Sequence, residues 1–171
     1  MTVYNALLRA VFIGGTGRLP MTAPISMFKS AGHRRIETYA ASGNLVFESS
    51  QSERAVKAGL ETRLEAYAGQ PVTVIVRTAL EWAAVLTANP FPRSLANRVA
   101  GIFVHEKPPT DALERLVGQT AEKVRLGVRE IYVSYGTGMA HSKLKIPGAA
   151  AGTARNINTV ARLAGIAAGY G

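Results

Sequence analysis

The segment Thr38-Tyr-Ala-Ala-Ser-Gly-Asn-Leu-Val-Phe47 constrains the fold more than any other stretch of the chain. It predicts two short strands, over residues 35–40 and 44–48, that fold back on each other at Ser42-Gly43-Asn44. Glycine and asparagine suit this corner because both readily adopt the positive φ that a tight hairpin requires. The corner also carries small polar groups that are able to hold an anion, although an ordinary hairpin turn uses the same residue types.

The segments around this hairpin predict the order β-α-β-β-α-β. Residues 3–9 are apolar and predict a strand, and a helix is expected from about residue 21 to a stop at Gly32. A second helix begins at Ser52 or Glu53 and carries an apolar stripe at three- and four-residue spacing, and residues 72–77 predict a β-branched strand. This order is that of the ferredoxin-like fold, in which an antiparallel sheet packs against two helices.

Two prolines in Asn89-Pro-Phe-Pro92 mark the boundary that we predict between residues 1–88 and residues 89–171. A short helix around Trp82 precedes them. After them we expect strands over residues 98–105, 122–126 and 130–135, with helices over residues 111–117 and 158–167. The second half thus approximates β-α-β-β-α. We therefore predict an α+β protein of two ferredoxin-like (βαββαβ-type) halves, with antiparallel sheets packed on helices.

The formal charge of +9 and the pI near 10.3 indicate an anionic partner, such as nucleic acid or a phosphorylated small molecule. The alternative is a general compositional bias, because the charges are scattered and form no block of one sign. The chain has no cysteine, which excludes disulfides and thiolate catalysis and fits a cytoplasmic protein. Its apolar N-terminal stretch is far shorter than the roughly 20 residues of a membrane span, so we expect no membrane partner.

Three distant places supply the kinds of group that anions require. Arg9 follows the first strand and precedes Gly14-Gly15, whose backbone can approach an anion closely. The hairpin tip adds polar side chains, and the start of the last helix offers the positive end of a helix dipole. Each place also has a plain structural reading, as a surface arginine, a turn and a cap. We predict that a cleft between the two halves binds an anionic ligand through these residues: Arg9, Gly14, Gly15, Ser42, Asn44, Lys143, Arg155 and Asn156.

The densest basic region of the sequence lies in its last third. Beyond residue 122 the basic residues are Lys123, Arg125, Arg129, Lys143, Lys145, Arg155 and Arg162, against the single acid Glu130. A second hypothesis is a metal-independent enzyme in which His141 or Lys143 transfers a proton and Arg9 stabilises charge. A third is a structural or protein-interaction module whose exposed sheet face pairs with another subunit.

Metal and cofactor sites are not expected. The three histidines are far apart in sequence and lack the spacing of metal ligands. The glycines near residue 14 match neither the G-x-G-x-x-G fingerprint nor a G-K-[ST] loop, so no nucleotide cofactor is predicted. No paired carboxylates and no G-x-S-x-G elbow point to a hydrolase, and catalytic residues remain unassigned.

Five motifs, taken in order along the chain, resemble a family of mostly bacterial proteins classed only as a domain of unknown function. The family signature is Y-x-A-L-L-R-G-I-N-V-G-G, T-Y-x-x-S-G-N-V-V-F, N-P-F, S-K-L and R-N-W-N-T-V-x-K-L, which corresponds here to residues 4–15, 38–47, 89–91, 142–144 and 155–163. The resemblance implies a two-part α+β protein with ferredoxin-like halves and no established activity. R-G-I-N stands here as Arg9-Ala-Val-Phe12, and the family tryptophan as Ile157.

Overall fold

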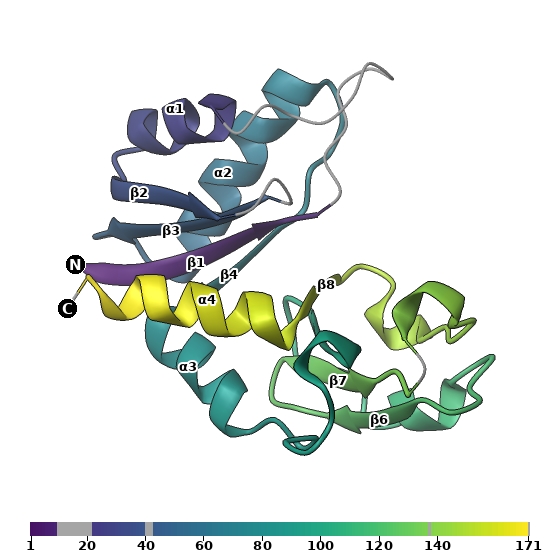
Figure 1. The fold of residues 1–171 in the computed structure, drawn as a ribbon. Coiled ribbons are helices and arrows are strands. Elements are labelled where there is room, and N and C mark those ends of the chain that lie inside the picture. Colours follow the sequence, from purple (N-terminus) through teal and green to yellow (C-terminus); the bar gives the residue numbers. More distant parts are fainter. Residues whose placement is uncertain (10–21, 40–42, 137, 171) are drawn as a thin grey trace. The chain divides into compact units, whose positions relative to one another are not determined.

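The structure is a computed structural model that describes residues 1–9, 22–39, 43–136 and 138–170. Its contacts divide the chain into two compact units. Unit 1 comprises Met1–Trp82 and Leu163–Gly171, and unit 2 comprises Ala83–Arg162. The division falls inside two helices, α3 (Ala79–Thr87) and α4 (Ile157–Ala168), both labelled in Figure 1. The break that the sequence predicts, after residue 88 and with the whole last helix in the second half, stays a prediction.

Unit 1 has the predicted order of strands and helices. Its elements are β1 (Thr2–Leu8), α1 (Thr22–Ser30), β2 (Arg34–Tyr39), β3 (Asn44–Ser49), α2 (Glu53–Ala68) and β4 (Val74–Thr78). The strands form one antiparallel sheet in the order β2-β3-β1-β4, which is the ferredoxin-like arrangement (Figure 1). The corner at residue 43 joins β2 to β3 as predicted, because Gly43 has a φ of 82°.

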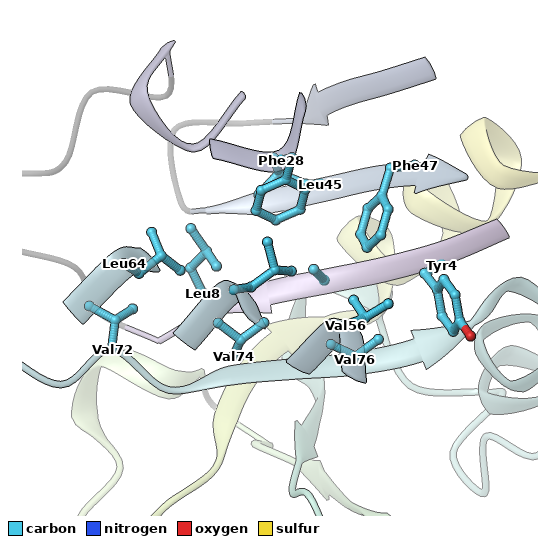
Figure 2. Packing of buried hydrophobic residues seen from close by; sticks show 12 residues of the cluster. Tyr4, Leu8, Phe28, Leu45, Phe47, Val56, Leu64, Val72, Val74 and Val76 are labelled. Carbon is cyan, nitrogen blue, oxygen red and sulfur yellow. The ribbon is translucent and has the colours of Figure 1, made fainter. Parts of the chain in front are cut away.

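The core of unit 1 lies between this sheet and helices α1 and α2. Alternate residues of β1, including Tyr4 and Leu8, share one face with Phe47 of β3 and Val76 of β4, and Figure 2 shows these side chains packed together. Phe28 of α1 joins them, with its ring centroid 5.0 Å from that of Phe47 at an interplanar angle of 84°. The buried side chains, which alternate along each strand, therefore pack against the apolar faces of the helices.

Helix α1 ends in a Schellman motif at the glycine predicted to stop it. Gly32 has a φ of 91° and donates its N–H to Lys29 O at 3.0 Å, and His33 donates its N–H to Phe28 O at 3.1 Å. The His33 ring then packs edge-on against the Phe28 ring, where such motifs usually place an apolar contact. Burial, and secondarily the charge of Arg63, lowers the pKa of His33, whose Nδ1 has no hydrogen-bond partner in the described structure.

Helix α2 has the caps that its sequence predicts. The Ser52 hydroxyl oxygen accepts a hydrogen bond from Ala55 N at 3.2 Å, and Gly69 adopts the left-handed conformation with a φ of 72°. The Gly69 N–H donates to Glu65 O at 2.9 Å and closes the last turn. These two residues therefore set the length of the helix.

Strand β2 contains a bulge that the C-terminal part of unit 1 fills. The register with β3 shifts between Arg34 and Glu37, and Arg35 has the positive φ of 50°. The Tyr170 hydroxyl donates to Arg35 O and lies 3.1 Å from Val46 O, while the Arg35 guanidinium carbon sits 4.4 Å from the Tyr170 ring centroid. Burial raises the pKa of Tyr170 to about 12.

Unit 2 repeats the strand order of unit 1. Strands β5 (Val99–Phe103), β6 (Lys123–Leu126), β7 (Glu130–Ser134) and β8 (Thr153–Asn156) form an antiparallel sheet in the order β6-β7-β5-β8. Short 3-10 helices occupy the connections: η1 (Ala96–Arg98), η2 (Ala112–Arg115), η3 (Met139–His141) and η4 (Pro147–Ala149). Two four-stranded antiparallel sheets with helices confirm the predicted α+β class.

Two elements of unit 2 differ from their sequence-based predictions. The helix expected over residues 111–117 is reduced to η2, because Leu116 packs on the sheet and Val117 forms a β-bridge with Lys145. Strand β8 was not predicted, since its four residues include Arg155 and Asn156 and pair with β5 alone. A short polar edge strand carries too weak an alternation to be recognised from sequence.

The two faces of the unit 2 sheet are covered differently. Val124, Ile131 and Val133 share one face, which we call the loop-covered face because Leu144 and Ile146 pack on it. Tyr132 belongs to the other face, where its hydroxyl donates to Val85 O of α3 at 2.8 Å. Burial raises the pKa of this tyrosine, with the charge of Glu130 as a second cause.

Candidate anion-binding surface

The segment 142–146 presents lysines outward because its residues alternate across the loop-covered face. Leu144 and Ile146 join the core cluster, whereas Lys143 and Lys145 between and beside them are exposed. This is the period-two pattern of an extended chain that lies on an apolar surface. The lysine ammonium groups are thus held on the outer side of unit 2.

A second segment, residues 117–123, is fastened to the first. Val117 N donates to Lys145 O at 3.0 Å and Lys145 N donates to Val117 O at 2.7 Å. Gly118 has a φ of 74°, and a Cβ atom at this position would lie 2.3 Å from Lys143 O, so the close approach of the two backbones requires glycine. Lys123 follows this segment as the first residue of β6, where it alternates with Val124 and therefore lies on the sheet face opposite to the loop-covered face.

The acid nearest to these lysines is turned inward. Glu122 is 7% exposed, and its Oε2 accepts from Thr120 N at 2.7 Å while its Oε1 accepts from the Ser142 hydroxyl at 2.8 Å. These two hydrogen bonds, that from Thr120 first, lower the pKa of Glu122, so it is a carboxylate at neutral pH. Its charge is satisfied by N–H and O–H donors and not by a lysine.

Glu130, at the hairpin between β6 and β7, is used in the same way. It is 5% exposed, and its carboxylate accepts from Val128 N at 3.2 Å and from Arg129 N at 3.1 Å. Unit 2 contains eleven lysines and arginines against five acids, a formal charge of +6. Asp111 forms an ion pair with Arg115 at 2.9 Å.

Lys143 and Lys145 therefore have no carboxylate partner within the described part of the chain. We call these two exposed residues the lysine surface. Lys143 belongs to the predicted site, and Lys145 was noted in the sequence only as part of a basic region. The alternation in residues 142–146 was the available signal for Lys145. The inward placement of Glu122 depends on tertiary contacts and has no sequence signal.

The predicted residues before α4 serve the fold of unit 2. Arg155 lies in β8 opposite Gly101, on the sheet face that also carries Tyr132, whereas Lys143 lies over the opposite, loop-covered face. The structure therefore does not bring Lys143 and Arg155 together. An Arg155 Nη1 donates to Thr153 Oγ1 at 2.8 Å and to Ala154 O at 2.9 Å, and burial lowers the pKa of Arg155 to about 10.

Asn156 is the N-cap of α4. Its Oδ1 accepts a hydrogen bond from Thr159 N at 2.8 Å, as expected when an asparagine directly precedes the helical residue Ile157. The sequence predicted Asn156 as an anion ligand, with a helix cap as the alternative at this place. Its side-chain oxygen is engaged by the helix.

Two predicted residues of unit 1, Arg9 and Asn44, lie at the end of the sheet where β1 finishes and β3 begins. Arg9 is exposed there and donates its backbone N–H to Thr73 O at 3.0 Å. Asn44 pairs with Leu7 and is fully buried, and its Nδ2 donates to Tyr39 O at 3.0 Å, so its amide fastens the hairpin. Gly14, Gly15 and Ser42 lie outside the described residues.

The structure gives no support to the proposed proton-transfer residue. His141 is exposed in η3, and it has no hydrogen-bonded carboxylate or hydroxyl among the residues described. A general base normally needs such a partner to fix its ring orientation and tautomer. No group of three or more metal-ligating side chains occurs in the described ranges, and no helix within them is long and apolar enough to cross a bilayer.

Comparisons with known proteins agree with this fold. A family model described as "Protein of unknown function (DUF1697)" matches residues 1–132. Among solved structures, the chain is similar to one titled "The structure of conserved bacterial protein SP0830 from Streptococcus pneumoniae", with a TM-score of 0.79 and 24% sequence identity over 97% of this chain and 98% of that chain. At this identity the likeness shows the fold alone. No curated protein matches the sequence.

Proposed function

This chain belongs to the family described as Protein of unknown function (DUF1697), and since that description assigns no activity, we propose from the chain's own chemistry that it binds an anionic, phosphate-bearing ligand at the lysine surface of unit 2. The observation that carries the proposal is the placement of the acids. Glu122 and Glu130 are buried and occupied by N–H and O–H donors, which leaves the positive charge of Lys143 and Lys145 without a carboxylate in the described structure.

The ligand that fits best is an extended polyanion such as a nucleic-acid backbone. Lysine ammonium groups act as compact point charges toward phosphate and impose little geometry of their own. Lys143 and Lys145 are exposed and two residues apart, an arrangement that suits successive phosphates along a strand more than a single enclosed phosphate. A phosphorylated small molecule is the alternative, and competition experiments separate the two.

The test is a salt titration of binding to fluorescein-labelled single-stranded and duplex DNA. Neutralising the surface in the variant Lys143→Ala/Lys145→Ala should weaken binding and reduce the slope of log K against log[salt] by about 1.4–1.8 units, because each phosphate contact contributes roughly 0.7–0.9. Inorganic pyrophosphate should compete only weakly if the ligand is extended, and strongly if a small phosphorylated molecule is bound.

The matched control removes the same charge from unit 1. Lys29 and Arg34 are exposed there, and their double alanine variant lowers the net charge equally. It should bind DNA within about twofold of the parent protein. Equal losses in both double variants would show that binding follows net charge alone, and either that result or a parent protein that fails to bind at low salt would overturn the proposal.

A further inference from the structure

We propose that strand β6 is a docking edge for an extended acidic peptide, which would add to the unit 2 sheet as a fifth strand. The proposal concerns main-chain groups of β6 and does not depend on binding of phosphate by the lysine surface. β6 lies at one end of the sheet, so one side of its backbone has no neighbouring strand in the part of the chain that the structure describes. Such an edge offers a row of N–H and C=O groups to another chain.

The hydrogen-bond pattern of the β6–β7 hairpin shows which main-chain groups of β6 point away from β7. Gly127 N donates to Glu130 O at 2.7 Å, and in an antiparallel pair the residues that face the partner alternate with those that face away. Lys123 and Arg125 therefore direct their main-chain groups to β7, while Val124 and Leu126 direct theirs outward. Among the described residues, the sole hydrogen bond to these outward groups is that from Arg125 Nη1 to Val124 O, at 2.9 Å.

Strand β4, an edge of unit 1, shows how this chain closes an edge. The hydrogen bond from Arg9 N to Thr73 O shows that the main-chain groups of Thr73 face β1. Those of Val74, Val76 and Thr78 therefore face away from β1. Side chains form hydrogen bonds with four of these outward main-chain groups. Lys57 Nζ donates to Val74 O at 2.6 Å, and Arg77 Nη1 donates to Val76 O at 2.9 Å. Val74 N donates to Glu61 Oε2 at 3.1 Å, and Thr78 N donates to Glu81 Oε1 at 3.2 Å. No such set covers β6.

The two other edges are less suitable for a regular added strand. β2 is interrupted by the bulge at Arg35, which breaks the spacing of its outward groups, and it carries charges of both signs. β8 has the single outward residue Ala154 before Asn156 caps α4. β6 thus combines regular geometry, two outward residues and charge of one sign.

The side chains of β6 specify the chemistry of the partner. Lys123 and Arg125 are exposed on one face, two residues apart, and neither has a carboxylate partner in the described structure. Val124 and Leu126 point to the loop-covered face and its apolar cluster. An antiparallel strand that places acidic residues opposite the two cations and apolar residues opposite Val124 and Leu126 would satisfy both faces, because directly opposite side chains interact.

The Arg125 side chain covers part of the β6 edge before a peptide binds. Its guanidinium occupies Val124 O in the free protein, and an incoming glutamate offers it a charge-assisted hydrogen bond that is roughly twice as strong as a neutral one. Transfer of the guanidinium to the glutamate frees the Val124 carbonyl for a peptide N–H. Neutral or basic strands offer no such exchange and should not open the edge.

The experiment uses the full chain and an acetylated, amidated peptide about six residues long, in which glutamates alternate with valines. Nuclear magnetic resonance should show shifts of the Val124 and Leu126 amide signals, and N-methylation of the valines should reduce affinity at least about tenfold. N-methylation of the glutamates, whose N–H groups would point away from β6, should change affinity less than about twofold. Arg125→Glu should also weaken binding about tenfold, and Arg54→Glu in unit 1 is its matched control.

Equal effects of the two N-methylation patterns would overturn the proposal, as would equal effects of Arg125→Glu and Arg54→Glu. Absence of binding at millimolar peptide would do the same. DNA binding is measured on the same samples with Lys143→Ala/Lys145→Ala, which leaves β6 intact. Loss of peptide binding with retained DNA binding, or the reverse, therefore separates this surface from the proposed function.

Discussion

Replacement of Tyr170 by phenylalanine should destabilise unit 1 through the loss of a single hydroxyl group. In the folded chain this hydroxyl donates to Arg35 O, in the bulge of β2, and lies 3.1 Å from Val46 O of β3. The residue is 8% exposed, so water replaces the donor poorly after the substitution. Phenylalanine keeps the ring and therefore keeps its contact with the Arg35 guanidinium.

The expected cost of Tyr170→Phe is about 1–2 kcal/mol. Leaving a buried polar group without its partner costs about 1–3 kcal/mol, and the lower part of this range applies because the Arg35 side chain is itself exposed. Tyr170→Ala also removes the buried ring and the cation–π contact, so it should cost about 3–5 kcal/mol. For a chain of this length, the phenylalanine variant should melt about 2–8 °C lower.

Chemical denaturation followed by fluorescence measures these differences. The chain has one tryptophan, Trp82, which belongs to unit 1 and is 0% exposed, so its emission reports unfolding of that unit. Because the pKa of Tyr170 is raised from 10.0 to about 12, its contribution to stability is present below pH 10 and is lost as the pH rises toward 12. Tyr170→Phe should lack that part of the alkaline loss.

Tyr67→Phe is the control for the loss of a tyrosine hydroxyl. Tyr67 is 49% exposed and should tolerate the change within about 0.5 kcal/mol. If Tyr170→Phe unfolds at the same denaturant concentration as the parent protein, the hydroxyl does not hold the bulge and the reasoning is wrong. A Tyr170→Phe variant as unstable as Tyr170→Ala would also refute it, since the ring would then contribute nothing.

Two further predictions concern unit 2 and acid stability. Gly118→Ala should cost more than about 3 kcal/mol in denaturant unfolding, because it adds left-handed strain to a Cβ 2.3 Å from Lys143 O. Gly69→Ala, with a similar φ and no atom within 4 Å of the added Cβ, should cost only about 1 kcal/mol; equal costs would contradict the steric argument. Because the pKa of His33 is lowered, unit 1 should lose stability as the pH falls below about 6.5, and His33→Phe should remove that part of the loss. Identical pH profiles of the two proteins between pH 5 and 8 would count against burial of a neutral imidazole.

The sequence was most informative where local signals and tertiary packing agree. Gly32, Ser52 and Gly69 end or begin helices as predicted, since capping depends on a few neighbouring residues. The order of strands in unit 1 followed from hydrophobic periodicity. Strand β8 and the reduction of the helix at residues 111–117 did not, because both depend on pairing with distant segments.

The candidate site shows the same limit more strongly. Residue type suggested Asn44, Arg155 and Asn156 as anion ligands, yet their side chains make hydrogen bonds within a hairpin, an edge strand and a helix cap. Asparagine and arginine are as useful for fastening backbone groups as for binding ligands, and sequence alone does not separate the two uses. The lysine surface emerges only when the partners of Glu122 and Glu130 are known.

Tyr170 is translated after the strands that its hydroxyl contacts and also after unit 2. The strands and helices of unit 1 through β4 are translated first, then all of unit 2, and Tyr170 follows near the end. Until then the nascent chain holds the bulge at Arg35 without the hydroxyl that later binds its carbonyl. Unit 1 therefore reaches its final stability only after unit 2 has been made, and an expression fragment that stops at residue 88 should behave like this unfinished intermediate.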